Sequence, residues 1–533
     1  EVNNLVDLIN SGSLPSKLTE LSSQTVGASF GEDTLQTTLI AGIIGISLII
    51  LILLLVYRFA GFISAVSMMI YTFLVFLVFW VVGGVLTLPG IAALVLGIGM
   101  AVDSNVIMFA RIKDELYKGK SLPLAFKEGT KSSFSAILDS NLTTLLVAII
   151  MFIFGESSIK GFATMLIITV VVTMLTMVAL TRILLKAVVK TGYFDKRTRA
   201  FINVKKEDIP DVNKNEKVKV IPFKNVNFLR YSKVFITISL IIMVLGGILF
   251  GTRGLNLGID YQAGSDISIE TNEKVTQKEL SKDLKTLKLD KESIEINDSD
   301  ITIRVSDVLD GKKVEKVTNY FSDKYEAKTN VGVVSNVVKQ ELVKNAILSV
   351  LVAILGIILY ISIRFRLTYA VSGVVVLMHD VLVVFSLFAL FHLEISTMFI
   401  AAILAIIGYS INATIVTFDR VREKLRDVDE RKLTKEELKG LVNESIRQMF
   451  TRTIYTSITT LVPVIALIFL GSKEILTFNF AMLFGLIAGT YSSVFIATWL
   501  FVLLETKNLG KPKKKKIVYT DEYEEKAIKG INC

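Results

Sequence analysis

Asp103 has the clearest potential for chemistry in this 533-residue chain, because it is a carboxylate inside an apolar segment. It lies about 12 Å of helix rise from Arg111, which places it within the hydrocarbon region of a membrane rather than at its edge. A carboxylate in such surroundings either pairs with a cation or takes up a proton. We therefore predict that Asp103 binds a proton. The alternative is a hydrogen bond between helices, made together with Ser104 and Asn105.

Four other ionisable residues accompany apolar segments, and each has more than one interpretation. Asp139 could join the polar cluster around Asp103 or form hydrogen bonds near the membrane interface. His379 and Asp380 lie in the middle of an apolar segment. A histidine can carry a proton near neutral pH, but a buried His–Asp pair can also satisfy itself, and we favour the structural role for His379. Arg452 begins an apolar segment, and alone it would be an anchor whose guanidinium reaches the membrane surface.

The segment around Asp103 has a second copy in the chain. Residues 97–116 read GIGMAVDSNVIMFARIKDEL and align without a gap with residues 406–425, IIGYSINATIVTFDRVREKL. Residues 133–155 and 449–471 form a second similar pair. The matched positions are Gly99 with Gly408, Asp103 with Asn412, Arg111 with Arg420, and Thr143-Thr144 with Thr459-Thr460. Because both copies enter the membrane from the same side, we predict parallel repeats about an axis along the membrane normal.

The composition is that of a membrane-spanning protein. Hydrophobic residues make up 52% of the chain, and the mean hydropathy is +0.59. Apolar runs of about 20 residues are long enough to span a membrane. Eleven such helices are expected, near 37–57, 63–86, 88–110, 135–154, 160–187, 233–252, 346–364, 369–391, 394–417, 451–471 and 477–504. The single cysteine, Cys533, excludes intramolecular disulfides and a cysteine-cluster metal site.

Basic residues concentrate in a few of the segments between these helices. The net charge is +10, and Lys and Arg crowd residues 111–131, 182–206, 420–452 and 511–516. By the positive-inside rule these segments are cytoplasmic, which puts Glu1 outside and Cys533 inside. Asp419 is expected at the inner membrane interface. We expect the basic segments to contact lipid headgroups rather than nucleic acid, because no basic module interleaved with aromatic residues is present.

The order of these segments predicts the domain organisation. Residues 1–31 are polar and are expected to be the tail end of a truncated outer domain, with a further membrane span before it. The other expected units are a first half of five spans at 32–190, a cytoplasmic linker at 191–232, the leading span of the second half at 233–252, an outer domain at 253–345, five more spans at 346–505 and a basic cytoplasmic tail at 506–533.

The outer domain at 253–345 is predicted to fold as βαββαβ. Strand-like residues 266–271 precede an amphipathic helix at 276–288. Two segments with apolar residues at every second position predict a hairpin around Ser299-Asp300. A second amphipathic helix and a last strand follow. This order is that of a ferredoxin-like α+β sandwich.

Several motifs occur in an order typical of one family. VDSNVIMFARIKDEL, ILDSNLTTL and IKGFA are similar to SecD motifs. LGIDYQAG at 257–264, the HD pair at 379–380, GYSIN, FDRVRE, NESI, TRTIYTSITTL and GLIAGTYSSVF are similar to SecF motifs. Over nearly its whole length the chain therefore resembles the fused SecDF protein-export membrane proteins, which are relatives of the resistance-nodulation-division transporters. A fusion of two related proteins would also explain the internal repeat.

The resemblance implies a role in protein export. SecDF proteins assist the SecYEG channel and SecA, with YajC and a YidC-type insertase as further partners, and use the proton-motive force to promote preprotein release on the outer side. The resemblance implies no enzyme activity and no nucleotide hydrolysis or cofactor, with protons as the coupling ion. In that family the aspartate matching Asp103 and the arginine matching Arg452 belong to the proton-conducting site. Arg452 is thus expected to be the charge partner of Asp103.

Two positions depart from the family pattern. The usual SecF motif is GYSINDT, but this chain has GYSINAT, with Ala413 in place of the second intramembrane acid. The usual SecD motif is FER, and here Ala110 makes it FAR. Either Asp103 carries the proton with other help, or the proton path is incomplete. The alternatives are a non-transducing scaffold of the translocon, which Ala413 favours, and a small-molecule or lipid exporter, which the compact outer domain disfavours.

Overall fold

The computed structural model describes residues 22–25, 28–210, 223–271, 275–289, 291–297, 300–426, 428 and 433–509. Most of the expected outer segment 1–31, part of the linker 191–232, Ser299 of the expected hairpin and the basic run 511–516 lie outside the described residues.

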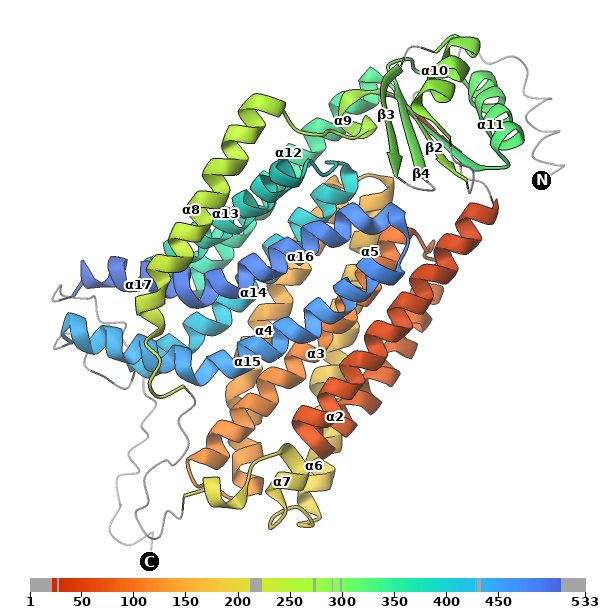
Figure 1. Cartoon of the computed structure of the whole chain (residues 1–533). Helices are drawn as coiled ribbons and strands as arrows, with labels where there is room; N and C mark the ends of the chain where they lie inside the picture. Colours follow the sequence, from red (N-terminus) through yellow and green to blue (C-terminus); the bar gives the residue numbers. More distant parts are fainter. Residues whose placement is uncertain are drawn as a thin grey trace, which may run out of the picture.

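Long helices form a bundle, and a small sheet covered by two helices lies at one end of it (Figure 1). Ten helices of the described residues are long and apolar enough to span a membrane. The bundle contains α2 (Ala28–Val81), α3 (Leu88–Tyr117), α4 (Leu122–Phe154), α5 (Ser157–Thr173), α6 (Thr181–Lys190), α8 (Phe228–Arg253), α12 (Asn336–Arg364), α13 (Leu367–Phe391), α14 (Thr397–Arg426), α15 (Lys435–Leu470), α16 (Leu476–Tyr491) and α17 (Ala497–Thr506). Short helices α7 (Thr198–Ile202) and α9 (Ile259–Gln262) lie between them.

Helix α2 contains two of the expected spans. Arg58 interrupts it with non-helical backbone angles, φ 54° and ψ −124°. A Cβ added at Gly61 would lie 2.0 Å from the carbonyl oxygen of Leu53, so the two arms fold back closely on each other. In an uninterrupted helix these two residues would be about 12 Å apart along the axis. With the two arms counted separately, the described helices give the eleven apolar segments that the sequence predicts.

At the end of the bundle away from the sheet, several helices extend farther than hydropathy predicts. Helix α15 begins at Lys435 rather than at residue 451, because Thr434 and Glu437 form a capping box ahead of the apolar run. Such a box satisfies free backbone N–H groups and fixes a helix start in polar sequence. Arg452 therefore lies in the middle of a 36-residue helix rather than at its beginning.

The last span of each half contains a π-helical turn. These turns are Met174–Leu180, between α5 and α6, and Ser492–Ile496, between α16 and α17. They stand at equivalent places in the two repeats. A π turn displaces side chains from the regular helix and is frequent at functional sites.

The outer domain has the predicted ferredoxin-like order. It consists of β2 (Gly264–Glu270), α10 (Gln277–Thr286), β3 (Lys291–Asn297), β4 (Asp300–Val305), α11 (Gly311–Tyr325) and β5 (Lys328–Val334). The sheet order is β1-β5-β2-β4-β3, with antiparallel neighbours throughout, and β1 (Ser22–Thr25) extends it at one edge. Period-2 alternation buries Ile267, Ile303 and Val331 in one core with apolar residues of α10 and α11.

Asp283 of α10 ties the two helices of this domain together. It accepts hydrogen bonds from Tyr320 and Tyr325 of α11 and forms an ion pair with Lys324. Burial alone would raise the pKa of Asp283, but the Lys324 ammonium and the two tyrosine hydroxyls hold it below its ordinary value. A carboxyl with a lowered pKa stabilises the fold above its unfolded pKa, about 3.9, and this contribution is lost as the pH falls through the folded pKa.

We predict that Asp283→Asn removes part of the acid sensitivity of the outer domain. At neutral pH the variant should open more easily, because the ion pair with Lys324 is gone. As the pH falls below about 4 and through the lowered folded-state pKa of Asp283, the difference from the parent chain should shrink, since Asp283 becomes protonated first in the unfolded and then in the folded state. Hydrogen exchange of α10 and α11, corrected for intrinsic rates, measures this. Asp323→Asn, at an exposed position of α11, is the control; an equal effect of both variants would contradict the prediction.

The two halves pack against each other reciprocally. Helix α3 of the first half contacts α15 of the second, and α14 of the second contacts α4 of the first. Gly99 permits one approach, since an added Cβ would lie 3.2 Å from the Thr459 carbonyl oxygen. Gly408 faces Thr144 at the matching contact. The repeated glycine of each half thus meets the repeated Thr-Thr pair of the other, as small residues do where membrane helices approach closely.

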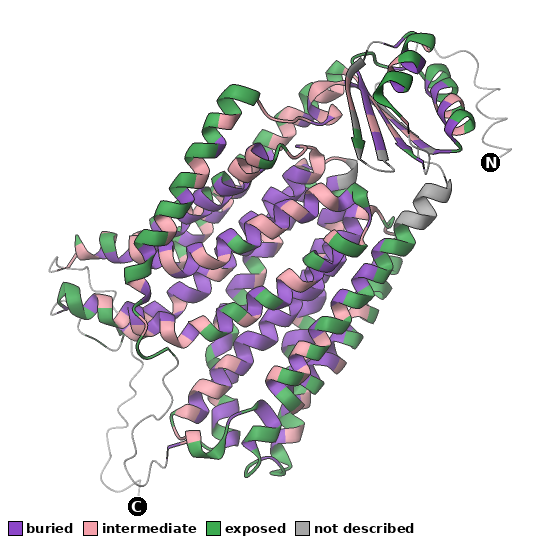
Figure 2. Ribbon diagram, viewed as in Figure 1, coloured by how far each residue is buried: buried purple, intermediate pink, exposed green. Residues whose placement is uncertain are grey.

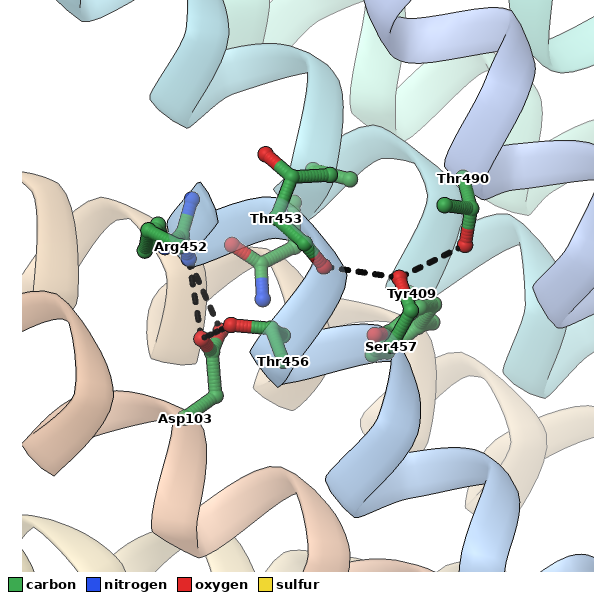
Figure 3. Close-up of a pocket in the computed structure, with 9 residues that line it drawn as sticks. Asp103, Tyr409, Arg452, Thr453, Thr456, Ser457 and Thr490 are labelled. Carbon is green, nitrogen blue, oxygen red and sulfur yellow. Dashed lines mark hydrogen bonds and ion pairs between the residues drawn. The ribbon is translucent and has the colours of Figure 1, made fainter. Parts of the chain in front are cut away.

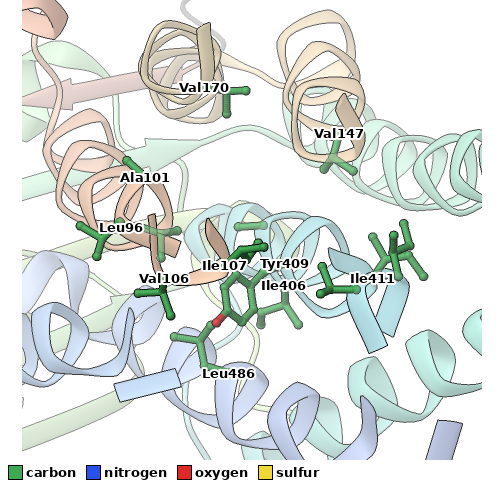
Figure 4. Packing of buried hydrophobic residues seen from close by; sticks show 14 of the residues in the cluster. Leu96, Ala101, Val106, Ile107, Val147, Val170, Ile406, Tyr409, Ile411 and Leu486 are labelled. Carbon is green, nitrogen blue, oxygen red and sulfur yellow. The ribbon is translucent and has the colours of Figure 1, made fainter. Parts of the chain in front are cut away.

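Helices α3 and α14 form the centre of the bundle, and their buried residues appear as continuous stretches in Figure 2. Outer helices such as α8 and α12 instead expose many apolar side chains, which is the pattern expected for surfaces that face lipid. Figure 4 shows side chains of α3 and α14, among them Val106 and Ile406, packed between neighbouring helices. This packing fixes the positions of the polar residues that the same two helices carry.

Candidate functional site

Asp103 and Arg452 form a buried ion pair between the two halves. The Arg452 Nη2 donates to both carboxylate oxygens of Asp103, at 2.9 and 3.2 Å (Figure 3). Thr456, one turn along α15, donates to the same carboxylate at 2.7 Å. Asp103 and Arg452 are only 3% and 4% exposed. The interpretation of Arg452 as an anchor at the membrane surface is therefore wrong, because its charge is neutralised inside the bundle.

A small cavity adjoins this ion pair. Its volume is about 10 Å³, roughly the space required by the centre of one water molecule. Asn412 and Ala413 of α14 line it together with Asp103 and Arg452. Ala413 thus occupies the position from which a second carboxylate would face the same guanidinium. Within the described residues, the buried Nε of Arg452 has no hydrogen-bond partner, which leaves one donor for water or another acceptor.

The ion pair exists in only one of the two repeats. Asn412 is the repeat equivalent of Asp103, and the alignment of residues 133–155 with 449–471 places Ala136 opposite Arg452. Although α14 packs on α4 as α3 packs on α15, the second contact lacks both charges. The internal duplication has therefore kept the scaffold in both halves and the charged pair in one.

A second charged network lies where the C-terminal ends of α3 and α14 meet α15. Arg111 of α3 pairs with Glu423 of α14 at 2.8 Å, and Arg420 of α14 pairs with Asp114 of α3 at 3.3 Å. These pairs are reciprocal, because Arg111 is equivalent to Arg420 and Asp114 to Glu423 in the repeat. Arg420 also donates to Gln448 of α15 at 2.6 Å. The network joins the two halves between the Asp103 site and the C-terminal ends of α3 and α14.

Asp419 takes part in this network. It pairs with Arg422 at 2.6 Å and lies 3.8 Å from Arg111. The neighbouring residue Arg420 is 4% exposed, so Arg420 is a buried connection between helices. The sequence predicts only a position at the membrane interface for Asp419, without these ion pairs.

We predict that Glu423→Gln lowers the stability of the bundle more than Asp114→Asn. Glu423 pairs with two arginines, at 2.8 and 2.9 Å, whereas Asp114 pairs with one at 3.3 Å. The expected losses are about 1–2 kcal/mol and below about 1 kcal/mol, reduced because Glu423 is partly exposed to solvent. Thermal unfolding in detergent measures both. Glu436→Gln, in an exposed ion pair with Lys439, is the control; equal losses in all three variants would contradict the prediction.

Asp139 belongs to a different cluster from Asp103. Its carboxylate accepts hydrogen bonds from Tyr360 at 3.0 Å and from Arg364 at 2.8 Å, both on α12. Arg364 also donates to Ser135 of α4. Asp139 therefore connects α4 of the first half to α12 of the second half. Of the two interpretations from sequence, the structure favours the local hydrogen-bonded one.

His379 and Asp380 form a third polar cluster, within the second half. His379 Nδ1 lies 2.8 Å from Asp380 Oδ1, and Asp380 also accepts hydrogen bonds from Ser410 of α14 and, at 2.9 Å, from Ser492. Ser492 begins the π turn of the last span, which brings its hydroxyl to the carboxylate. Asp380 is fully buried. The pair is largely self-satisfied, although His379 Nε2 has no partner within the part of the chain that the structure describes.

The remaining motif residues serve packing between helices. Asn105 donates to Ser64 of α2 at 2.7 Å and lies against Met177 of the first π turn. The hydroxyls of Thr143, Thr144 and Thr459 donate to backbone carbonyls of their own helices, and Thr460 also contacts Tyr409 at 3.1 Å. Ala110 is partly buried beside Arg111. Asp103 thus pairs with Arg452 and Thr456, and the hydrogen bonds of Asn105 are separate from this pair.

Sequence reasoning did not identify Thr456, Tyr360, Arg364 or the reciprocal pairs at Asp114 and Glu423. The repeat contained a usable signal for the reciprocal pairs, since an arginine and an acid three residues later occur in both copies. Residues three apart share one helix face. When the two repeats meet around a two-fold axis, the arginine on each such helix face can pair with the acid on the other. No comparable pattern in the sequence indicates Tyr360 or Arg364.

Fold and site together define a polytopic helical membrane protein of two parallel repeats, with the buried Asp103–Arg452 ion pair between them and a ferredoxin-like domain at one end. Residues 10–191 and 313–507 match the family model described as "Protein export membrane protein SecD/SecF, C-terminal". The chain belongs to this SecD/SecF family. As a member, it is a multi-pass protein of a bacterial membrane.

Individual relatives agree with this assignment. The chain is 41% identical over 516 residues to "Protein translocase subunit SecDF" of Bacillus subtilis, covering 96% of this chain and 70% of the relative. It is 30% identical to the Brucella abortus protein of that name, covering 94% of this chain and 64% of the relative. A crystal structure of Thermus thermophilus SecDF, described as a translocon-associated membrane protein, matches with a TM-score of 0.82 and 30% identity. That match covers 95% of this chain and 67% of the Thermus chain.

Proposed function

We propose that this chain acts as an accessory subunit of Sec-dependent protein export and uses the proton-motive force to promote preprotein translocation. The observation that carries the proposal is the Asp103–Arg452 pair, in which both charged side chains are buried between the two halves. An ionised pair at this depth is sensitive to proton uptake, because protonation of the carboxylate removes half of a mutually neutralising pair. Protons are then the coupling ion, and no other cofactor takes part.

In the proposed cycle Asp103 accepts the proton and Arg452 holds the unprotonated carboxylate in place. Protonation weakens the contact between α3 and α15, because a neutral carboxyl attracts the guanidinium less strongly. Thr456 keeps a hydrogen bond to either form, since a protonated carboxyl still has an acceptor oxygen. The two halves can then shift relative to each other.

Contacts between the outer domain and the start of α14 support a route from this shift to the outer side. Asp260, just before the sheet, accepts a hydrogen bond from the Thr397 backbone N–H at 2.9 Å. Residues 256–258 and Ile395 exchange backbone hydrogen bonds at 2.7 and 2.9 Å. Arg304 of β4 pairs with Glu394 at 2.9 Å. Movement of α14 would therefore be passed to the sheet through short polar contacts.

The proposed partners are the SecYEG channel, SecA, and YajC and a YidC-type insertase. They are inferred from the family and from the description of the Thermus relative as translocon-associated. The substrate would be a translocating preprotein, released on the side of the outer domain. The proposed orientation places the sheet outside and the basic segments in the cytoplasm.

The deciding experiment measures preprotein release from inverted membrane vesicles or proteoliposomes that contain the Sec channel, with and without a proton gradient. The parent chain, Asp103→Asn and Ala413→Asp are compared. Release that is insensitive to the gradient in every form would reject proton coupling and favour the non-transducing scaffold, for which Ala413 is the supporting observation. Absence of copurification with the channel proteins would instead reopen the small-molecule exporter.

A further inference from the structure

A groove with two arginines lies at the end of the bundle opposite the sheet. It has a volume of about 570 Å³ and is lined by residues of the turn of α2 and of the segment just before α7. Figure 1 shows α7 at the end of the bundle away from the sheet. Its lining includes Arg58, Phe59 and Phe62 of α2, with Tyr193, Phe194 and Arg197 of the opposite segment. None of these residues contributes to the Asp103 site or to the charged network at the inner ends of α3 and α14.

No ion pair within the described part of the chain neutralises the charges of this groove. Arg58 is exposed and forms no ion pair with any residue that the structure describes. Arg197 has a tyrosine rather than a carboxylate as its partner, with its guanidinium 4.6 Å from the Tyr193 ring. Residues 181–210 as a whole carry eight basic and three acidic residues. Because the positive charges outnumber the acids near them, the groove attracts an anion.

A basic stripe extends from this groove along α6. Arg182, Lys186 and Lys190 follow one another at intervals of four residues and are all exposed. Residues at this spacing lie on one helix face. None of the three forms an ion pair among the described residues. Basic pockets and stripes of this kind on the cytoplasmic side of membrane helices bind acidic lipid headgroups.

The walls of the groove are largely aromatic. The Phe194 ring lies 4.7 Å from that of Phe59 and 5.3 Å from that of Phe201, while Phe62 and Tyr193 remain 51% and 60% exposed. An apolar wall beside guanidinium groups that form no ion pair with a described residue suits an amphiphile better than a free anion. The basic groups can hold a phosphate while the rings contact hydrocarbon chains.

The backbone of Arg58 is a separate sign that the groove has a use. Its φ of 54° lies in the left-handed region that favours glycine. A non-glycine residue held in such a conformation costs about 1–3 kcal/mol, and residues of this kind cluster at ligand-binding sites. A glycine would make the tight turn of α2 at lower cost but without a guanidinium group.

We propose that this groove binds an anionic phospholipid of the inner leaflet. Arg58 and Arg197 contact the headgroup phosphate, and Phe59, Phe62 and Leu54 contact the acyl chains. The bound lipid would hold the turn of α2 against the α6–α7 segment and so stabilise the inner end of the first half.

Lipid binding to the whole chain, purified in detergent and stripped of lipid, is measured by native mass spectrometry with phosphatidylglycerol and phosphatidylcholine as probes. We expect tighter binding of phosphatidylglycerol. The double variant Arg58→Gln/Arg197→Gln should bind it roughly 25-fold more weakly, from a loss of about fivefold for each basic residue. Arg58→Gly should also bind more weakly while remaining at least as stable as the parent, which separates loss of the lipid from loss of the fold.

The matched control is Arg230→Gln/Lys233→Gln, which removes two exposed positive charges from the inner end of α8. Its phosphatidylglycerol affinity should equal that of the parent chain. An equal loss in both double variants would overturn the proposal, because it would indicate only a general attraction of positive charge. Equal binding of the two lipids would overturn it as well. Displacement of the lipid by millimolar glycerol phosphate would identify a free-phosphate site and would also overturn it.

Discussion

Replacing Asp103 by Asn is expected to abolish the gradient-dependent part of preprotein release and to destabilise the bundle at the same time. The amide cannot take up a proton, so the proposed coupling step is lost. It also leaves Arg452 buried without a counter-charge. Removing one partner of a buried ion pair typically costs about 3–5 kcal/mol. Release with and without a gradient measures the first effect, and thermal unfolding in detergent the second.

The double variant Asp103→Asn/Arg452→Gln separates these two effects. It removes both charges, and neutral replacement of a complete buried pair is often much less costly than removal of one partner. Most of the lost stability should therefore return, but the gradient dependence should not. If the double variant regained gradient-dependent release, the role of Asp103 would be purely structural.

Ala413→Asp is expected to increase gradient-dependent release severalfold. The new carboxylate would enter the cavity that Ala413 shares with Asp103 and Arg452. Two carboxylates that face one guanidinium cannot both stay ionised at low cost, so one of them takes up a proton more readily. The unpartnered Nε of Arg452 offers the added group a donor within the site that the structure describes. The same release assay, at several gradient strengths, measures the change.

Ala413→Asn is the matched control for this substitution, because it adds a side chain of nearly the same size without an acid. It should leave the gradient response of the parent chain unchanged. Equal responses of the Asn and Asp variants would show that the second acid does not limit this chain. Combining Ala413→Asp with Asp103→Asn then tests whether the new carboxylate can act alone.

Much of the fold could be predicted because membrane helices and amphipathic strands have strong local patterns. The apolar runs gave the spans, and period-2 alternation in 293–305 gave the hairpin of β3 and β4. The predicted helix ends were less accurate than the predicted spans. Hydropathy detects the part of a helix within the membrane but not a polar extension such as residues 435–450 of α15. The Thr434–Glu437 capping box is the local signal that marks the true start.

The sequence also identified Asp103 and Arg452 as candidate site residues, but it could not show that they meet. Residue depth follows from position along one helix, whereas contact depends on how each helix is rotated and which helix lies beside it. Hydropathy alone was consistent with Arg452 at the lipid interface, and packing of α15 against α3 turned it inward instead. Helix packing likewise decides that Asp139 pairs with Arg364 of α12 and that Asp380 accepts hydrogen bonds from Ser410 and Ser492.

By itself, the sequence determined that this is a duplicated membrane protein with a single intramembrane acid where the repeats carry their polar motif, because both features depend on residue type and order. Only the tertiary structure decided that the repeats pack reciprocally, that Arg452 neutralises Asp103 and that Ala413 lines the same cavity. Asp103 and Arg452 are 349 residues apart in the chain. Contacts at such separation arise from close packing of whole helices, which no local pattern encodes.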